Sequence, residues 1–262
     1  HDHSSELSHI KIDFTPSSIQ KHLQGKDVVI CIFSGSDLRL SPVVVDAAIS
    51  ARIKLFIPSE FGLDTSSPKI RELLPPYQTR FEVQEQLRNS SLKWKAIYSG
   101  IMLEDGLKTG GVLGIDVMWG SVVVFPGAAS LKVALSTYED VASEIISALT
   151  AKDAADTTGR YTSTFTATLD DLIQIVEKQL DRKLDRYEGN IEGARKEAAE
   201  RMKMGYFDGG VALMGRIAVW GPETGAWEKW AKNENPQDWQ QTVGKMAQLV
   251  RDGDIGGDGC GC

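Results

Sequence analysis

Residues 47–64 read AAISARIKLFIPSEFGLD, and the apolar run at 54–57 in the middle of this stretch ends abruptly at Pro58. Because proline cannot donate a hydrogen bond to a sheet, a short apolar run that stops at a proline predicts one buried strand. Helical patterns precede this strand at 43–51 and follow it at 80–89, so the strand belongs to an alternating α/β series. Ligands of such sheets bind just beyond the carboxyl ends of the strands, where Ser59 and Glu60 fall. From the spacing alone, a loop with a capping serine and a solvated glutamate is the favoured interpretation.

The composition limits the class of protein. With 262 residues, 42% of them hydrophobic and 25% charged, the chain is long enough for one large domain or two coupled lobes. A net charge of −7 argues against a nucleic-acid partner and gives no reason to expect an anionic membrane surface. No apolar run reaches the roughly 18 residues of a transmembrane helix, and the polar start at 1–6 is unlike a signal peptide. An odd number of cysteines, without the spacing of a disulfide framework, is typical of a reducing, cytoplasmic setting.

The first third of the chain alternates between strand and helix patterns. Residues 10–14 alternate as a short strand, and Thr15 and Pro16 then begin a helix to residue 23 as cap and first-turn residue. The uninterrupted apolar run at 28–33 predicts a strand buried on both faces. Pro42 opens the helix at 43–51, the segment 64–68 has turn chemistry, and the prolines at 75 and 76 exclude a helix before Gln78. A helix at 79–89 and a strand at 94–98 follow.

The remainder of the chain shows other patterns. Apolar patches punctuated by glycine fill 106–127, a helix at 141–150 has Asp140 in its first turn, and residues 161–166 alternate as a strand. Helices are expected at 169–180, at 191–204 and at 226–250, where Asn235 and Pro236 interrupt the last one. We expect the glycine-rich tail at 253–262 to be disordered, and the paired Cys260 and Cys262 on it to be incidental. No metal site is expected.

Three stretches carry a resemblance to a known family. The segment FIPSEFG at 56–62 resembles the strand-end signature of the isoflavone-reductase-like and NmrA-like family, which are atypical short-chain dehydrogenases that bind NADP(H) on a Rossmann fold. LQGKDVVI at 23–30 and WKAIYSG at 94–100 agree with it in order and spacing. The resemblance covers 10–150 well and the rest loosely. It implies an α/β, doubly wound parallel sheet with a smaller C-terminal substrate lobe: a partial cofactor-binding domain at 1–105, and a substrate-lobe region at 106–252 that interleaves with the core.

The resemblance also implies where the cofactor lies. NADP(H) would cross the ends of the strands, with the loop after residue 33 along its nicotinamide–ribose half. The cofactor-binding residues carried over in this way are Phe33, Ser34 and Gly35, then Pro58, Ser59 and Glu60, then Tyr98, Ser99 and Gly100, together with Asp13 and Phe14, which match the place after the family's third strand.

Two departures from the family pattern stand out. A dinucleotide fold opens with a strand, a glycine-rich turn and a helix that holds the pyrophosphate, and this sequence has no such stretch near its start. We therefore expect poor NADP(H) binding and self-association through an unpaired sheet edge. The second departure is Arg80, which stands at the position assigned to the catalytic lysine. Arginine stays protonated, so we expect it to polarise an oxyanion or hold a cofactor phosphate rather than act as a base. The dehydrogenase pair Tyr-x-x-x-Lys is also absent, because Phe81 stands four residues after Tyr77.

The function implied by the resemblance is NADPH-dependent hydride transfer to a small aromatic or polyketide-like secondary metabolite, with Arg80 as the polarising group. Five of the six tryptophans lie after residue 118, which favours an aromatic substrate pocket. The arginine favours a different class, a non-catalytic NmrA-like regulator that senses NADP(H). A truncated, inactive relative is the third interpretation.

Overall fold

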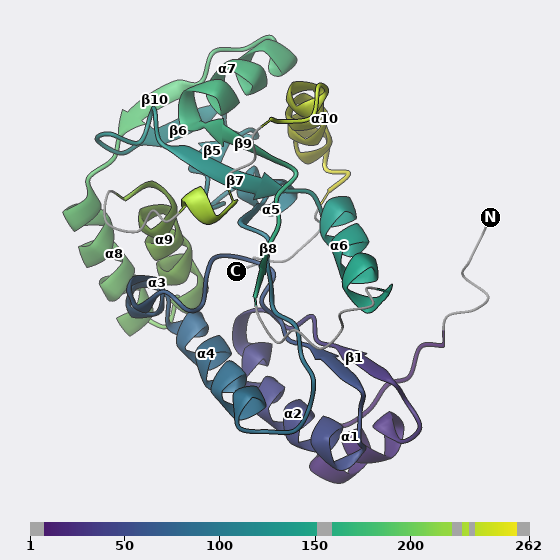
Figure 1. Cartoon of the computed structure of the whole chain (residues 1–262). Helices are drawn as coiled ribbons and strands as arrows, with labels where there is room; N and C mark the ends of the chain where they lie inside the picture. Colours follow the sequence, from purple (N-terminus) through teal and green to yellow (C-terminus); the bar gives the residue numbers. More distant parts are fainter. Residues whose placement is uncertain (1–7, 151–158, 222–226, 231–233, 256–262) are drawn as a thin grey trace.

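The structure is a computed structural model that describes residues 8–150, 159–221, 227–230 and 234–255 (Figure 1). The expectations for the tail from residue 256 onward, and for the helix start at Ala226, lie outside these residues.

A parallel sheet forms the first half of the molecule. β1 (Val28–Ile30) pairs with β2 (Leu55–Ile57), and an isolated bridge between Phe56 and Trp94 continues the sheet toward β3 (Ile97–Tyr98), which pairs with β8 (Arg160–Tyr161). All these pairings are parallel, so the carboxyl ends of the four strands meet at one edge. The strand predicted at 54–57 is confirmed as β2, and its three residues are buried.

Helices accompany this sheet (Figure 1). They are α1 (Pro16–Leu23), the 3-10 helix η2 (Gly35–Leu40), α2 (Ser41–Ser50) and α4 (Pro75–Arg88). The short helix α3 (Pro68–Leu73), which precedes α4, packs instead against α9 (Phe207–Trp220), as Figure 1 shows. The predicted start of α1 is confirmed, because Pro16 occupies its first turn and the Thr15 hydroxyl accepts a hydrogen bond from the Ser18 N–H at 3.4 Å.

The second half holds two mixed three-stranded sheets. In one, β7 (Lys132–Ser136) lies between β4 (Ile101–Met102), which is parallel to it, and β9 (Phe165–Thr168), which is antiparallel. In the other, β6 (Ser121–Val124) lies between a parallel β10 (Asp185–Glu188) and an antiparallel β5 (Ile115–Asp116). The helices here are α5 (Leu103–Gly106), α6 (Tyr138–Thr150), α7 (Leu169–Leu180), α8 (Ile191–Lys203), α9 (Phe207–Trp220), the 3-10 helix η3 (Trp227–Trp230) and α10 (Trp239–Asp252).

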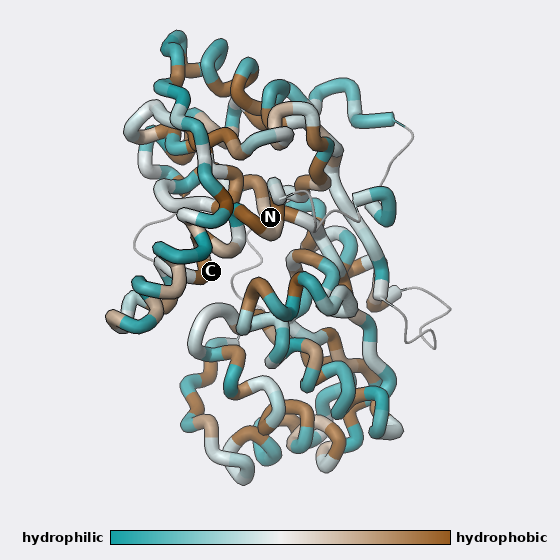
Figure 2. Tube along the Cα trace, turned by 90° about the vertical axis from the view of Figure 1, so that its left-hand side faces the viewer, coloured by the Kyte–Doolittle hydropathy of each residue, from teal (hydrophilic) through white to brown (hydrophobic). Residues whose placement is uncertain are grey.

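Each half has its own hydrophobic core. One cluster centres on β1, β2, α2 and α4 and takes in Trp230 from η3. The other joins α7, α9 and α10 to the second-half strands and takes in Ile70 and Leu73 from α3. Figure 2 shows brown and teal stretches alternating along the helices of both halves, as expected for elements with one buried face. The fold is thus an α/β fold with parallel sheet segments, as the sequence predicts.

Two strand predictions near the start are wrong in part. Residues 10–14 form no strand, and Ile10 and Phe14 are 62% and 43% exposed. Alternation alone does not make a strand where no partner strand is available, and none of the described strands pairs with this segment. β1 is shorter than 28–33 and is not buried on both faces. Val28, Ile30 and Ile32 lie on one face of the chain and are exposed, whereas Val29 and Cys31 on the opposite face are buried.

Helix boundaries also differ. The prediction that the prolines exclude a helix before Gln78 is wrong, because α4 begins at Pro75. The N–H groups in the first turn of a helix have no acceptor within the helix, so proline, which lacks an N–H, is tolerated there. The helix at 141–150 begins earlier, at Tyr138, and the Thr137 hydroxyl accepts a hydrogen bond from the Asp140 N–H at 3.1 Å. The last predicted helix is a 3-10 turn followed by α10 from Trp239. Sequence patterns did not predict the helices η2, α3, α5 and α9, or the strands β4, β5, β6, β7 and β10.

Candidate functional site

The segments that follow β1 and β2 lie together at the carboxyl edge of the sheet. The Ser59 hydroxyl accepts a hydrogen bond from the Phe33 N–H at 2.8 Å, which ties the loop after β1 to the loop after β2. The Phe33 ring meets the Phe14 ring edge-on, with 5.8 Å between their centroids. Three of the residues carried over from the family therefore lie side by side. Gly35 begins η2 with a φ of +52°, a backbone angle that favours glycine.

Asp13 and Ser34 are exposed. Asp13 interacts with the start of α1: its carboxylate accepts a hydrogen bond from the Thr15 hydroxyl at 3.0 Å. Hydrogen bonds from Ser18 and Thr15 lower the pKa of Asp13 below its usual range. In this structure Asp13 binds Thr15, the N-cap residue of α1.

Glu60 is completely buried, so its interpretation as a solvated residue is wrong. Its carboxylate accepts hydrogen bonds from the Thr65 hydroxyl at 2.5 Å and from the Gln84 amide at 2.8 Å. Burial raises the pKa of Glu60, although the positive charge of Arg80 and the two hydrogen bonds oppose the shift. Pro58 and Ser59 are buried beside it.

Gln84, on α4, joins two strand ends. The same amide nitrogen that donates to Glu60 donates to the Tyr98 hydroxyl at 2.9 Å, and the Gln84 carbonyl accepts from Arg88 at 2.7 Å. Tyr98 is 4% exposed, and burial, reinforced by the charge of Glu60, raises the pKa of its hydroxyl. The loops after β2 and β3 are therefore held by one buried polar side chain from a helix.

Arg80 lies one turn before Gln84 on the same helix. Its guanidinium stands over the Tyr77 ring, 4.5 Å from the centroid, and the Tyr77 hydroxyl accepts from the Leu63 N–H at 3.0 Å. A Cβ atom at Gly62 would lie 2.5 Å from the Tyr77 hydroxyl and 3.2 Å from an Arg80 nitrogen, so a larger residue there would displace these two side chains. The Arg80 Nε and one Nη are buried and have no hydrogen-bond acceptor among the described residues. These buried, cationic N–H groups fit an oxyanion or a phosphate oxygen.

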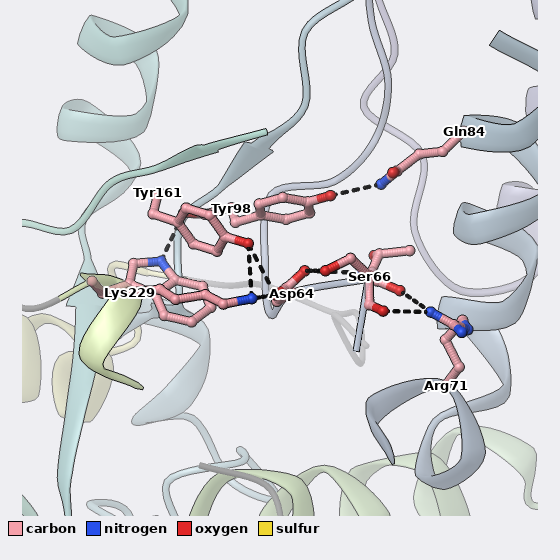
Figure 3. A network of polar contacts seen from close by, with 9 residues as sticks. Asp64, Ser66, Arg71, Gln84, Tyr98, Tyr161 and Lys229 are labelled. Atoms are coloured by element: carbon pink, nitrogen blue, oxygen red, sulfur yellow. Dashed lines mark hydrogen bonds and ion pairs between the residues drawn. The ribbon is translucent and has the colours of Figure 1, made fainter. Parts of the chain in front are cut away.

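A second polar cluster contains Asp64, Tyr161 and Lys229 (Figure 3). One Asp64 carboxylate oxygen accepts from the Lys229 ammonium at 2.5 Å and from the Tyr161 hydroxyl at 2.9 Å, and Lys229 lies 3.3 Å from that hydroxyl. The other oxygen accepts from the N–H and the hydroxyl of Ser66 at 2.8 and 2.5 Å. Arg71 holds the same loop by donating to the carbonyls of residues 65 and 66.

The protonation states in this cluster follow from its contacts. Burial alone would raise the pKa of Asp64, but the hydrogen bonds from Lys229 and Ser66 outweigh it, so the pKa is lowered. The hydrogen bond with Asp64 raises the pKa of Lys229. Burial raises the pKa of Tyr161. At neutral pH the cluster therefore holds a carboxylate, an ammonium ion and a neutral phenol.

Aromatic rings extend from Tyr98 to η3. The centroids of Tyr98 and Tyr161 are 5.1 Å apart, those of Tyr161 and Trp230 are 4.9 Å apart, and those of Trp230 and Trp227 are 5.4 Å apart. The Trp230 indole N–H donates to the Tyr98 carbonyl at 2.8 Å. The 3-10 helix η3 is thereby attached to the end of β3.

Ser99 and Gly100 connect β3 to β4 and are buried. Gly100 has a φ of +70°, and a Cβ atom there would lie 2.5 Å from the Ala134 carbonyl oxygen. Its N–H donates to the Gly62 carbonyl at 3.0 Å, and the Ser99 carbonyl accepts from the Ser136 hydroxyl at 2.7 Å. These two hydrogen bonds fix the backbone after β3 against the loop after β2 and against β7.

Sequence reasoning missed the polar residues that join the elements. Gln84, Tyr161, Lys229 and Trp230 carried no motif, and they reach the site from α4, β8 and η3. Asp64 lies in the stretch at 47–64, but the turn chemistry of residues 64–68 does not indicate its place in the site. Two surface hollows of about 550 and 590 Å³ contain none of these side chains; Arg201 with residues 204–209 lines the first, and Pro126 with residues 188–192 lines the second.

The described histidine, cysteine, aspartate and glutamate side chains include no group of three or more that could hold a metal ion. Within the same residues, no helix is both long and apolar enough to cross a membrane.

Comparison with known proteins gives a family and a shared fold. The model of the NmrA-like family matches residues 4–207. A curated relative, oxidoreductase aprR of Aspergillus flavus, is 37% identical over 106 residues, which are 37% of this chain and 36% of the relative. The match thus spans about a third of the relative's length.

Two solved structures illustrate the shared fold. The binary complex of leucoanthocyanidin reductase with NADPH from Vitis vinifera has a TM-score of 0.72 at 14% identity and covers 91% of this chain and 81% of that one. An isoflavone reductase has a TM-score of 0.63 at 18% identity and covers 81% of this chain and 69% of that one.

Proposed function

Since the chain belongs to the NmrA-like family, we propose that it is an NADP(H)-dependent oxidoreductase of the isoflavone-reductase-like type that acts on a small aromatic or polyketide-like molecule. The similarity to an oxidoreductase and the fold shared with an NADPH-bound reductase support the reaction class and the cofactor. The proposal assigns cofactor binding chiefly to residues 1–105 and substrate binding to 106–252. It includes a cytoplasmic setting, and self-association through the exposed edge of β1.

The observation that carries the proposal is the pair of buried Arg80 nitrogens that find no acceptor within the described part of the chain. A guanidinium stays charged at every physiological pH, and a buried donor without an acceptor is costly. We assign these N–H groups to an oxygen that bears negative charge, either on the substrate during reduction or on a cofactor phosphate. Arg80 is then the polarising group, as the resemblance implies.

The cofactor would be held at the ends of β1, β2 and β3. The residues assigned to it are Phe33 to Gly35, Pro58 to Glu60 and Tyr98 to Gly100, with Asp13 and Phe14 at the margin. When bound, the nicotinamide supplies a hydride. Ser59 fixes the loop after β1 against the loop after β2, and Gln84 fixes the loop after β2 against β3. The protein thereby sets the shape of the site before a ligand arrives.

Substrate chemistry is inferred from the aromatic side chains at the same edge. The partly exposed ring of Tyr161 lies beside the polar cluster of Asp64 and Lys229, and the buried Trp230 packs edge-on against that ring. Flat aromatic molecules that carry an oxygen function match this combination.

Titration of the purified chain with NADPH, followed by NADPH oxidation with a panel of aromatic ketones, aldehydes and enones, tests the proposal. We expect weak but saturable NADPH binding, because the sequence shows no glycine-rich turn near its start, and oxidation of NADPH that depends on the added substrate. Absence of NADPH binding would overturn the cofactor assignment, and binding without oxidation by any compound would overturn the enzymatic one.

The structure offers one reason to keep the regulator as a second candidate. The buried centre of the site contains Gln84, which does not titrate, and a Glu60 whose two oxygens are both hydrogen-bonded. Such a satisfied network suits ligand sensing as well as catalysis. A sensor would bind both NADPH and NADP⁺ but would transfer no hydride, so it would neither oxidise NADPH nor reduce NADP⁺ with any substrate.

A further inference from the structure

We propose that Tyr161 is the catalytic proton donor of this site, and that Lys229 and Asp64 are positioning residues that supply and orient its proton. The inference rests on the proposed reductase function and names the acid that such a reduction requires.

The location of Tyr161 carries the first part of the argument. It is the last residue of β8, which runs parallel to β3, so its side chain leaves the sheet at the carboxyl edge where ligands of such sheets bind. The ring is fixed from two sides, by Tyr98 at 5.1 Å and by Trp230 at 4.9 Å. A phenol held in this way loses little further freedom when it meets a substrate.

The contacts of the hydroxyl carry the second part. Its proton is directed at Asp64, 2.9 Å away, while its oxygen lies 3.3 Å from the Lys229 ammonium (Figure 3). Lys229 is 42% exposed, whereas Asp64 is 4% exposed. The ammonium group of Lys229 therefore connects solvent to the half-buried phenol of Tyr161. The buried carboxylate of Asp64 accepts a hydrogen bond from each of these two donors.

The tyrosine nearest to it is less suited to the task. The Tyr98 hydroxyl is buried and hydrogen-bonded to the Gln84 amide, beside the carboxylate of Glu60. The phenol of Tyr161 combines partial exposure with a direct contact to a proton source.

The chemistry balances with the cofactor already proposed. A hydride from NADPH adds to the substrate carbon and forms a C–H bond, the C=O or conjugated π bond breaks, and the oxygen becomes an alkoxide or enolate. That oxygen takes the Tyr161 hydroxyl proton and leaves a phenolate. The phenolate takes a proton from the Lys229 ammonium 3.3 Å away, and Lys229 regains one from water. The net consumption is one NADPH and one solvent proton for each substrate reduced.

The charged groups around Tyr161 favour a donor over a base. Among the described residues, the titratable groups that face Tyr161 are Asp64 from the loop after β2, Lys229 from η3 and Tyr98 from β3. The charge of Glu60 acts on Tyr98. Burial and the Asp64 carboxylate raise the pKa of Tyr161, and the Lys229 ammonium opposes them. The phenol stays protonated through neutral pH, as an acid must.

The test compares Tyr161→Phe with a matched control, Tyr187→Phe, at a residue of β10 that is 58% exposed. NADPH oxidation is followed with benzaldehyde, acetophenone and chalcone as probes, and NADPH affinity is measured by fluorescence titration. We expect Tyr161→Phe to lower kcat by about 10²–10⁴-fold while the Kd for NADPH changes by less than about threefold, and Tyr187→Phe to change neither. Undiminished turnover in Tyr161→Phe, beside an active parent, would overturn the donor assignment alone. A parent that binds NADPH but reduces none of the probes would overturn the proposed enzyme and the donor with it.

The pH profile separates a chemical role from a structural one. The parent should show no loss of kcat on the basic side up to about pH 10, near the ordinary pKa of tyrosine. Asp64→Asn removes the anion that raises the pKa of both Lys229 and Tyr161, so its rate should begin to fall at lower pH. A loss of rate that is equal at every pH would indicate a purely structural role for Asp64 and would contradict the relay.

Discussion

Gln84→Leu is the substitution that most directly tests how the candidate site is held together. Leucine has nearly the volume of glutamine and is as good a helix former, so α4 should persist. What the change removes is the single amide nitrogen that donates to Glu60 at 2.8 Å and to the Tyr98 hydroxyl at 2.9 Å.

The expected cost follows from the groups left behind. Glu60 is completely buried and Tyr98 is 4% exposed, so water cannot replace the lost donor at either one. Arg88 is exposed and can be hydrated, so its lost contact adds little. With about 1–3 kcal/mol for each buried polar group left unsatisfied, Gln84→Leu should lower the free energy of unfolding by about 2–5 kcal/mol.

Urea unfolding followed by tryptophan fluorescence measures this loss. The matched control is Gln78→Leu on the same helix, because Gln78 makes one exposed hydrogen bond, to Glu82 at 3.1 Å. The control should cost about 0.5 kcal/mol or less. In a Tyr98→Phe background one of the two orphaned groups is already gone, so Gln84→Leu should cost about 1 kcal/mol less there. Equal costs for Gln84→Leu and Gln78→Leu would refute the reasoning.

Three further changes test other features of the site. Arg80→Met should lower kcat for the aromatic probes by about 10²–10³-fold while Arg80→Lys, which keeps the charge, retains activity; unchanged turnover in Arg80→Met would show that the guanidinium polarises nothing. Gly100→Ala should destabilise the protein by about 1–3 kcal/mol more than Gly25→Ala. Both glycines have positive φ, but an added Cβ would meet a backbone oxygen at 2.5 Å only at Gly100, and nothing within 4 Å at Gly25; equal melting temperatures of the two variants would contradict the close approach. Glu60→Gln should gain stability relative to the parent as the pH rises. Burial raises the pKa of Glu60, so the folded parent holds a proton that the unfolded chain has released, and its stability falls from about pH 4.5 upward through the folded pKa. A stability difference between Glu60→Gln and the parent that does not change with pH would exclude a raised pKa.

Local patterns in the sequence determined the elements that depend on a few neighbouring residues. Thr15 and Pro16 predicted the start of α1, because a cap and a first-turn proline act within one turn. The apolar run closed by Pro58 predicted β2, and the motif that follows it identified the family and the edge of the sheet where Ser59 and Phe33 meet. Each of these features depends on residues that are close together in the sequence, so each can be predicted without the tertiary structure.

Tertiary structure decided burial and partnership. The apolar run at 28–33 could not reveal that Val28, Ile30 and Ile32 remain exposed, because burial depends on what covers each face of the strand. A glutamate that follows a strand is expected to be solvated, but Glu60 is buried because α4 places Gln84 against it. Lys229 and Asp64 are 165 residues apart, and no local pattern links them; packing of η3 against β3 and β8 brings them together. The proton transfer proposed for Tyr161 therefore depends on the tertiary structure, which places Lys229 and Asp64 in contact with its hydroxyl.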